Sequence, residues 1–235
     1  MQFLEKNTPI SLSEIITRFP YIREVIEISH SLDINFEVDG NRIMLMSPYS
    51  NSVCTNIDGE LDYHKKFFFK NSIYKQPLGK ALGLKRGEKK PHVFDVTAGM
   101  LGDSLLMHSF GCRVSAWERH PAAFILSANA IFNSSVDIDL TFGNAVDLHV
   151  NAYKECDVIY FDPMYGGKND KALPKKEMRI FREIVGVDSD AKVVAEKLKS
   201  KNKRLVVKRS IKTSPLMDNP CITFLGKSTA YDVYK

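Results

Sequence analysis

The strongest structural signal in the chain lies in the segment His92-Val-Phe-Asp-Val-Thr-Ala-Gly-Met-Leu-Gly-Asp103, where an apolar run precedes a turn of small residues. Similar apolar runs follow, separated by segments long enough for helical crossovers: Arg113–Glu118, Asp137–Phe142, Asp157–Asp162 and Arg204–Lys208. This rhythm predicts an α/β fold with a doubly wound, mostly parallel sheet. Ligands bind beyond the carboxyl ends of such strands, so the residues that close each run are the candidate site.

Composition bounds the class of protein. The 235 residues are 44% hydrophobic and 26% charged, which fits a compact globular unit and excludes a long disordered chain. No apolar run approaches the roughly 18 residues of a membrane span, and the N-terminus lacks a signal-peptide pattern, so we expect a cytoplasmic protein. The cysteines lie far apart with no ligand spacing, which predicts neither a metal site nor a disulfide framework: Cys54, Cys112, Cys156 and Cys221.

The chain divides into three predicted parts. Residues 1–76 read as a small α+β lobe, with a capping box at Ser11–Glu14 and a hairpin around Asp39-Gly40. Residues 77–91 are rich in glycine and lysine and read as a connecting segment outside the core. Residues 92–235 form the predicted ligand-binding α/β domain, and no catalytic cluster is apparent in the lobe.

The turns after the first three strands suit a nucleoside ligand. Asp95 closes the first strand, and the glycines Gly99 and Gly102 that follow allow a ligand to approach the backbone. Glu118 closes the second strand 23 residues after Asp95, near the spacing expected for an acid that binds a ribose diol. Gly143-Asn144-Ala145 follows the third strand, where an amide side chain can meet an adenine edge, although a plain turn explains Gly-Asn equally well.

The fourth strand closes on Asp162-Pro163-Met164-Tyr165, the most informative motif. An exocyclic amino group on a base is a poor nucleophile, because its lone pair is delocalised into the ring. The Asp162 carboxylate and the Pro163 carbonyl can accept its hydrogens, while the Tyr165 ring stacks on the base. These three residues are therefore the predicted catalytic group.

Three classes of protein are compatible with parts of this sequence pattern. A methyltransferase acting on DNA adenine or a protein amide would share the fourth-strand motif. A dinucleotide-binding oxidoreductase would use the glycine turn and the second-strand acid, but leaves residues 162–165 unexplained. A non-catalytic RNA-binding module would use only the basic residues.

Longer blocks resemble one family. DVTAG, CRVSAWERHP, VIYFDPMY, KKEMRIFREIVGVDSDA and RLVVKR are similar to the RsmJ family, which methylates the N2 amino group of a guanosine in small-subunit ribosomal RNA. The resemblance implies a Rossmann-like class I methyltransferase fold, S-adenosylmethionine as cofactor, and ribosomal RNA or its ribonucleoprotein particle as substrate. It also implies cofactor contacts at Gly102, Asp103, Glu118, Arg119, Asn144, Ala145 and Asp162. The chain departs from the family pattern at Leu101, where relatives have glycine, and at Gly102, where they have arginine.

Positive charge is concentrated after the fourth-strand motif. From Lys168 to Lys212 there are 15 Lys plus Arg and 6 Asp plus Glu, a local charge of +9 in a chain of +5. This segment returns to the sheet at the fifth strand, so its basic residues can border the cleft and hold phosphates. A solvated helix face is the alternative. The predicted RNA contacts are Lys175, Lys176, Arg179, Lys208 and Arg209.

Overall fold

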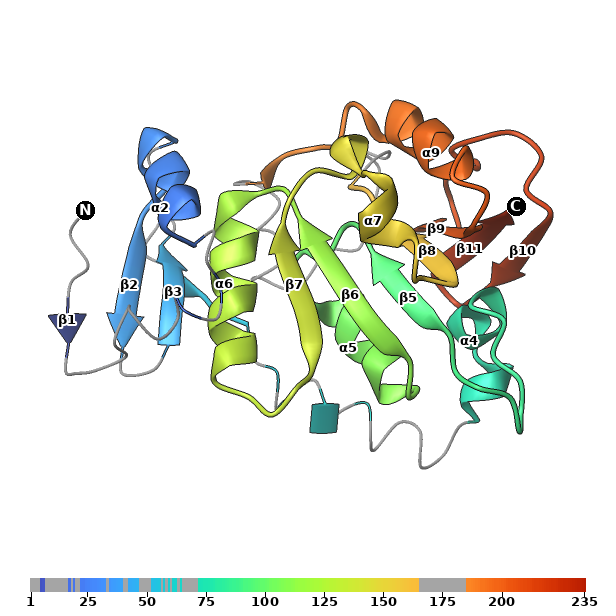
Figure 1. Cartoon of the computed structure of the whole chain (residues 1–235), viewed down its shortest axis with the longest axis horizontal. Helices are drawn as coiled ribbons and strands as arrows, with labels where there is room; N and C mark the ends of the chain where they lie inside the picture. Colours follow the sequence, from blue (N-terminus) through green and yellow to red (C-terminus); the bar gives the residue numbers. More distant parts are fainter. Residues whose placement is uncertain are drawn as a thin grey trace.

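The computed structural model describes residues 5–6, 17, 19, 22–32, 34–39, 42–46, 52–55, 57, 59, 61–62, 64, 72–164 and 185–235. Its main sheet has the order β10-β11-β9-β8-β5-β6-β7 (Figure 1). The strands are β5 (His92–Asp95), β6 (Arg113–Glu118), β7 (Ile138–Phe142), β8 (Val158–Phe161), β9 (Arg204–Ser210), β10 (Ile222–Leu225) and β11 (Thr229–Tyr234).

The five strands predicted from the sequence form the parallel part of this sheet. β7, β6, β5, β8 and β9 pair in parallel, so the predicted doubly wound α/β fold is confirmed. The strand order reverses between β5 and β8, which places the ligand crevice at their carboxyl ends. The antiparallel strands β10 and β11 were not predicted; β11 pairs with β9 and extends the sheet.

Helices cover both faces of the sheet (Figure 1). Successive strand residues alternate between two cores: Tyr160 and Val206 belong to one, whereas Phe161 and Val207 belong to the other. This alternation is the period of two that a β-strand imposes. One core is closed by α5 (Gly102–Ser109) and α6 (Pro121–Phe132), the other by α9 (Ala191–Lys199) and the 3₁₀ turn η2 (Ala145–Asp147). A short helix, α7 (Val150–Tyr153), precedes β8.

The N-terminal lobe has its own sheet, in the order β1-β2-β3-β4, and the helix α2 (Ile22–Ser31). Its strands are β1 (Glu5–Lys6), β2 (Phe36–Asp39), β3 (Arg42–Met46) and β4 (Ser52–Val53). β2 and β3 form the predicted hairpin, with Asp39 opposite Arg42. Gly40 and the capping box at Ser11–Glu14 lie outside the described residues.

The lobe packs on α6, which is predominantly apolar and is buried at every residue from Pro121 to Ile131. The rings of Phe19 and Phe124 meet edge to face at 6.3 Å between centroids, and the backbone N–H of Ile43 donates to Asn129 Oδ1 at 2.9 Å. Lobe and main domain therefore share one hydrophobic core.

The segment 77–91 is not the predicted linker, because its first half is part of the core. It begins with helix α4 (Pro77–Ala81), preceded by the 3₁₀ turn η1 (Ile73–Lys75). Leu78, Ala81 and Leu82 are buried in the shared core, and α4 contacts β10 and β11. Glycine and lysine content suggested a linker, but the apolar residues at helical spacing determine the packing.

None of the helices in the described ranges has the length and hydrophobicity that a membrane-spanning segment requires. The four cysteines are free: Cys112 and Cys156 are buried, whereas Cys221 is exposed. Burial raises the pKa of both buried thiols to about 11, so neither is an activated nucleophile.

Candidate active site

The carboxyl ends of the parallel strands open into a cleft of about 1260 Å³. It is lined by most of the residues that the sequence singled out: Gly99, Gly102, Asp103, Glu118, Arg119, Asn144, Ala145, Asp162 and Lys208. The lobe contributes Ile28, Leu32, Cys54 and Thr55 to the same wall, which sequence reasoning missed. The cleft therefore lies at the strand-order reversal and is shared by lobe and main domain.

Asp95 supports the first turn from below rather than lining the cleft. Its side chain is 1% exposed and accepts hydrogen bonds from Ser104 Oγ at 2.6 Å and from the Thr97 backbone N–H at 3.0 Å. Burial raises the pKa of Asp95 to about 7, against the effect of these hydrogen bonds. The expected direct cofactor contact by Asp95 is replaced by a structural role.

The glycine turn is fixed by its neighbours and leaves a cradle. Gly99 has a positive φ of 53°; its N–H donates to Glu118 Oε2 at 2.7 Å and its carbonyl accepts from Ser127 Oγ at 2.7 Å. Leu101 holds the left-handed conformation with φ 67°, which is ordinarily taken by glycine. A Cβ atom on Gly102 would meet nothing within 4 Å, so the backbone is open to a ligand where α5 begins.

Glu118 closes β6 and holds the next turn. Its Oε1 accepts from the His120 backbone N–H at 2.6 Å, and the residue is 6% exposed while still lining the cleft. Burial raises the pKa of Glu118 against these backbone hydrogen bonds. His120 Nδ1 is buried without a hydrogen-bond partner among the described residues, which leaves a polar atom for a ligand at this side of the cleft.

The Arg119 side chain lines the cleft and is held there by two aspartates, so its predicted cofactor contact stays a prediction. Its guanidinium pairs with Asp188 and, at 2.7 Å, with Asp190. Asp188 also accepts from the Met164 backbone N–H at 2.6 Å and donates its own N–H to the Met164 carbonyl at 2.9 Å. Arg119 therefore holds Asp188, which in turn is bonded to Met164 within the fourth-strand motif.

The third turn carries Asn144 and Ala145. The Asn144 Oδ1 accepts from the Val146 backbone N–H at 3.2 Å and caps η2, so this oxygen is used within the turn. Gly143 lies against the Trp117 ring, since a Cβ there would come within 2.9 Å of it. Glycine is thus required for close packing at the bottom of the cleft.

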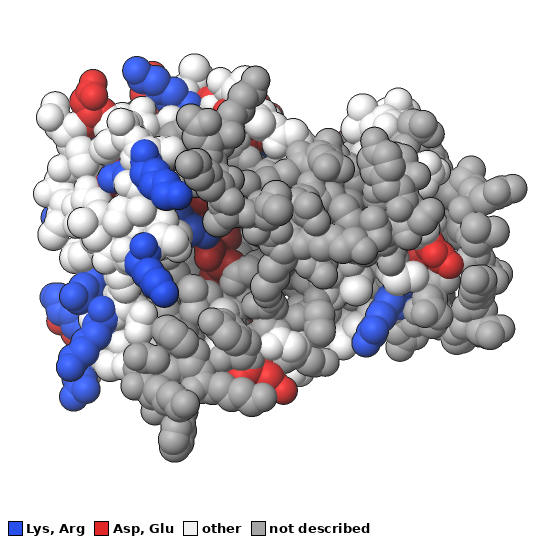
Figure 2. All heavy atoms as spheres, turned by 180° about the vertical axis from the view of Figure 1, so that it is seen from behind, with Lys and Arg blue, Asp and Glu red and all other residues white. Residues whose placement is uncertain are grey.

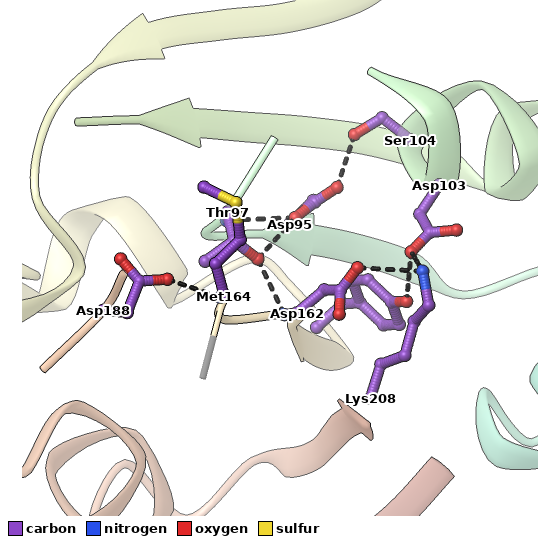
Figure 3. A network of polar contacts seen from close by, with 9 residues as sticks. Asp95, Thr97, Asp103, Ser104, Asp162, Met164, Asp188 and Lys208 are labelled. Carbon is purple, nitrogen blue, oxygen red and sulfur yellow. Dashed lines mark hydrogen bonds and ion pairs between the residues drawn. The ribbon is translucent and has the colours of Figure 1, made fainter. Parts of the chain in front are cut away.

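Asp162 lies at the centre of a polar network (Figure 3). Its backbone N–H donates to Thr97 Oγ1 at 2.7 Å, which joins the ends of β8 and β5. Its Oδ2 accepts from Lys208 Nζ at 2.8 Å, and the same ammonium donates to Asp103 Oδ2 at 2.6 Å. Asp103 Oδ2 also accepts from the Tyr160 hydroxyl at 2.5 Å.

This network sets the charges in the cleft. Burial raises the pKa of Asp162 above its ordinary value despite the opposing charge of Lys208. Burial also works against ionisation of Asp103, but Lys208 lowers its pKa. Burial alone would lower the pKa of Lys208, yet Asp103 and Asp162 together raise it well above its usual range. The ammonium is therefore charged, and it offsets the charge of the carboxylates.

Two predicted phosphate contacts need correction. Lys208 lies in the cleft, but its ammonium is already paired with Asp103 and Asp162. Arg209 forms an ion pair with the fully buried Asp232 at 2.7 Å and is itself 9% exposed, so its guanidinium is unavailable to RNA. Pro163 is buried, and its predicted catalytic role stays a prediction. Four further predicted site residues lie outside the described residues: Tyr165, Lys175, Lys176 and Arg179.

The sequence reading also missed Thr97, Ser104 and Asp188 as site residues. Thr97 and Ser104 are hydroxyl side chains in and just after a turn of otherwise small residues, which is a signal that they hydrogen-bond within it. Asp188 carries no local signal, because its partners lie 24 and 69 residues away along the chain.

Comparison with known proteins gives this site a class. Residues 47–235 match the family described as "Putative SAM-dependent methyltransferase", where SAM is S-adenosylmethionine. A SAM-dependent methyltransferase from Neisseria gonorrhoeae has a similar crystal structure, with a TM-score of 0.60 and 25% identity over 85% of this chain and 81% of that one. Fold, cleft and sequence match thus define a class I SAM-dependent methyltransferase.

Two relatives narrow the class. A protein from Thioalkalivibrio sulfidiphilus is 38% identical over 192 residues, 76% of this chain and 73% of the relative. Another from Laribacter hongkongensis is 35% identical over 202 residues, 81% of this chain and 71% of the relative. Both are named ribosomal RNA small subunit methyltransferase J, and the chain belongs to their family.

The cleft fits S-adenosylmethionine. The open backbone at Gly102, the acid Glu118 at the end of β6 and the unpartnered His120 Nδ1 supply a cradle and polar groups for a nucleoside with an amino-acid tail. The acidic side chains Asp103 and Asp162 suit a ligand that carries positive charge. The predicted cofactor is therefore compatible with the residues present.

Proposed function

We propose that the protein transfers a methyl group to the N2 amino group of a guanosine in small-subunit ribosomal RNA. The main support for this proposal is that Asp162 lines the cleft at the end of β8. The relatives of the chain are also named for methylation of this RNA. A carboxylate there can accept the hydrogens of a planar amino group and direct its lone pair.

The chain's own residues orient the amine. Asp162 accepts one hydrogen through its carboxylate, and the Pro163 carbonyl is the proposed second acceptor. Tyr165, in its predicted role, stacks on the base. The nitrogen would form the new bond to the methyl carbon while the bond from that carbon to the cofactor sulfur breaks, so the demethylated cofactor would leave as a neutral thioether. One proton of the amine would then pass to Asp162 or to water. Asp162 need not be a strong base, because the alkylated nitrogen loses its proton readily.

The cofactor would be held by the turns that follow β5, β6 and β7. Backbone at Gly102, the carboxylate of Glu118 and the turn at Asn144 and Ala145 are the proposed contacts, together with Asp103. When bound, S-adenosylmethionine supplies a methyl group already activated by its sulfonium. The protein's task is then to align the amine with this methyl group and to exclude water.

Lys175, Lys176 and Arg179 lie outside the described residues and remain proposed RNA contacts. Figure 2 shows Lys and Arg side chains in separate groups over the described surface of the face seen from behind. A guanosine held in a duplex would have to be unpaired or flipped to reach Asp162. Naked RNA and an assembled particle are both candidate substrates, and a cytoplasmic location stays a prediction.

Labelled methyl transfer tests the function. The protein is incubated with labelled S-adenosylmethionine and, in parallel, with unmodified small-subunit RNA, the assembled small subunit, DNA and total protein. Label in small-subunit RNA, mapped by mass spectrometry to N2 of one guanosine, is the expected result. Label at another atom, or in DNA or protein instead, contradicts the proposal and favours the alternative amino-methyltransferases. Membership of a methyltransferase family leaves no support for the dinucleotide-binding oxidoreductase.

A further inference from the structure

Lys208 has a position that neither phosphate binding nor simple packing explains. It comes from β9, yet its Nζ bridges the Asp103 carboxylate on α5 at 2.6 Å and the Asp162 carboxylate after β8 at 2.8 Å. Its side chain is 22% exposed. Two of its three ammonium protons are used by these carboxylates, so a phosphate would have to displace an existing ion pair.

The bridge is itself anchored. The Tyr160 hydroxyl donates to the Asp103 oxygen that also accepts from Lys208, and Tyr160 is fully buried on β8, the strand that ends beside Asp162. Tyr160 and Asp103 therefore hold the ammonium from one side. Asp162 is the partner at the open side of the bridge, where its side chain is 33% exposed and lines the cleft.

The two carboxylates need this cation. Like charges close together in a buried site disfavour each other's ionisation, and a cation between them reverses that effect. Without Lys208, Asp162 would carry its burial and the charge of Asp103 with no compensation. A protonated carboxyl group would then face the target amine and could accept fewer of its hydrogens.

We propose that Lys208 is a positioning residue for methyl transfer, which holds the Asp162 carboxylate ionised and aimed at the target amine. This role rests on the proposed function. The ion pair fixes Asp162 Oδ2, while the backbone N–H of Asp162 is fixed by Thr97 Oγ1. One contact thus fixes the backbone of Asp162 and another fixes its carboxylate before substrate arrives, which lowers the cost of alignment.

The ionisation of Asp162 depends on groups from every neighbouring element. In the described part of the chain, those that act on it come from β5, α5, β8, β9 and β11: Asp95, Asp103, Tyr160, Lys208 and Tyr231. Lys208 is the only cation among these described groups, so removing it should change the pKa of Asp162 in one direction only. The pKa of Asp162, already raised, should rise further.

The test compares Lys208→Met, Lys208→Gln and Lys208→Arg with the wild-type protein. Lys227→Met, an exposed lysine between β10 and β11, is the matched control. Methyl transfer to small-subunit RNA is measured from about pH 5 to pH 9, with kcat and KM separated. In the free protein, the Asp162 carboxyl group is titrated by ¹³C NMR, its signal assigned by its loss in Asp162→Asn.

Lys208→Met should lower kcat at neutral pH by about 100-fold, with KM for RNA changed by less than about two-fold. The acid limb of the kcat profile and the Asp162 titration should both move up by about 1–3 pH units. Lys208→Gln keeps a donor without the charge and should behave like Lys208→Met, whereas Lys208→Arg should retain the wild-type limb. Lys227→Met should leave all values unchanged. If Lys208→Met does not fold, Lys208→Gln carries the same test.

The proposal is overturned if Lys208→Met and Lys208→Gln leave both the acid limb of the kcat profile and the Asp162 titration unchanged. It is also overturned by a rise in KM for RNA with kcat and its pH profile intact, which would return Lys208 to phosphate binding. Failure of the proposed function is a different result: the wild-type protein then transfers no methyl group to RNA, while the titration in the free protein still tests Lys208.

Discussion

On the β5–β6 side of the cleft, Asp95 and Glu118 accept hydrogen bonds from the protein's own turns, whereas on the β8–β9 side Asp162 accepts from the ammonium of Lys208. The first pair is buried at 1% and 6% exposure, and the Asp162 side chain is 33% exposed. Hydrogen bonds to backbone fix the shape of a turn, while an ion pair fixes a charge. The difference separates a side whose turns are held rigid, where we propose that the cofactor binds, from a side whose charge is held in place, where we propose that the chemistry occurs.

Asp162→Asn should impair methyl transfer while leaving the turns on the β5–β6 side of the cleft intact. The amide cannot stabilise developing positive charge on the amine, so methyl transfer should fall by about 1000-fold or more at saturating RNA. Single-turnover methylation measures the loss, and thermal unfolding checks the fold. Near wild-type turnover in this variant would remove Asp162 from the catalytic role.

Arg209→Met should lower the free energy of unfolding and leave RNA affinity unchanged. Arg209 is adjacent to Lys208 in the sequence, but its side chain is paired with Asp232 rather than lining the cleft. The fully buried Asp232 would lose its ion pair, which costs about 3–5 kcal/mol. Chemical denaturation measures this cost, and the double variant Arg209→Met with Asp232→Asn should recover part of it. A weaker salt dependence of RNA binding in Arg209→Met would instead restore Arg209 as a phosphate contact.

Asp95 should make the stability of the free protein depend on pH. Its pKa is raised by folding to about 7, so the neutral form is favoured, and the stabilisation is lost as pH rises through that value. Between about pH 5 and pH 8 the free energy of unfolding should fall by about 2–3 kcal/mol. Asp95→Asn should flatten this dependence, and the exposed Asp139→Asn should not. Equal slopes in all three proteins would contradict the raised pKa.

Glu118→Gln should have the smallest effect of these substitutions, a weakening of cofactor binding. One amide oxygen replaces two carboxylate oxygens that accept from Gly99 and His120, so the turn loses a hydrogen bond and the ligand loses a charged acceptor. Affinity for S-adenosylmethionine should drop about 10-fold by calorimetry. Glu155→Gln, at an exposed site, is the control; unchanged affinity in Glu118→Gln would exclude Glu118 from cofactor binding.

The parallel sheet was predictable mainly from β5, β8 and the first half of β9, which read as continuous apolar runs because they are buried on both faces. β6 and β7 instead alternate between more and less buried residues, and the closing residues of all five strands fall at one edge of the sheet. β11 was not predicted although Tyr231 and Val233 are buried. It belongs to an antiparallel hairpin, which lacks the helical crossover that marks the parallel strands in the sequence. Helix α4 was hidden by its glycine and lysine residues.

Side-chain direction was the main limit at the site. Lys208 and Arg209 are adjacent on β9, so they point to opposite faces of the sheet, and the sequence alone does not say which one faces the cleft. Arg119 was placed at the right turn, but its partners Asp188 and Asp190 lie about 70 residues further along. Pairing over such distances depends on the complete fold.

Helix α6 carries a consequence for synthesis on the ribosome. The lobe emerges first, yet the Ile43 N–H bonds to Asn129, 86 residues later in the chain. At about 5–20 residues per second, the apolar face of the lobe waits several seconds for its partner. Nascent chains stalled before residue 132 and chains stalled far enough beyond it for α6 to have left the ribosome should therefore differ sharply in the protease resistance of the lobe, because the lobe completes its core only when α6 packs on it.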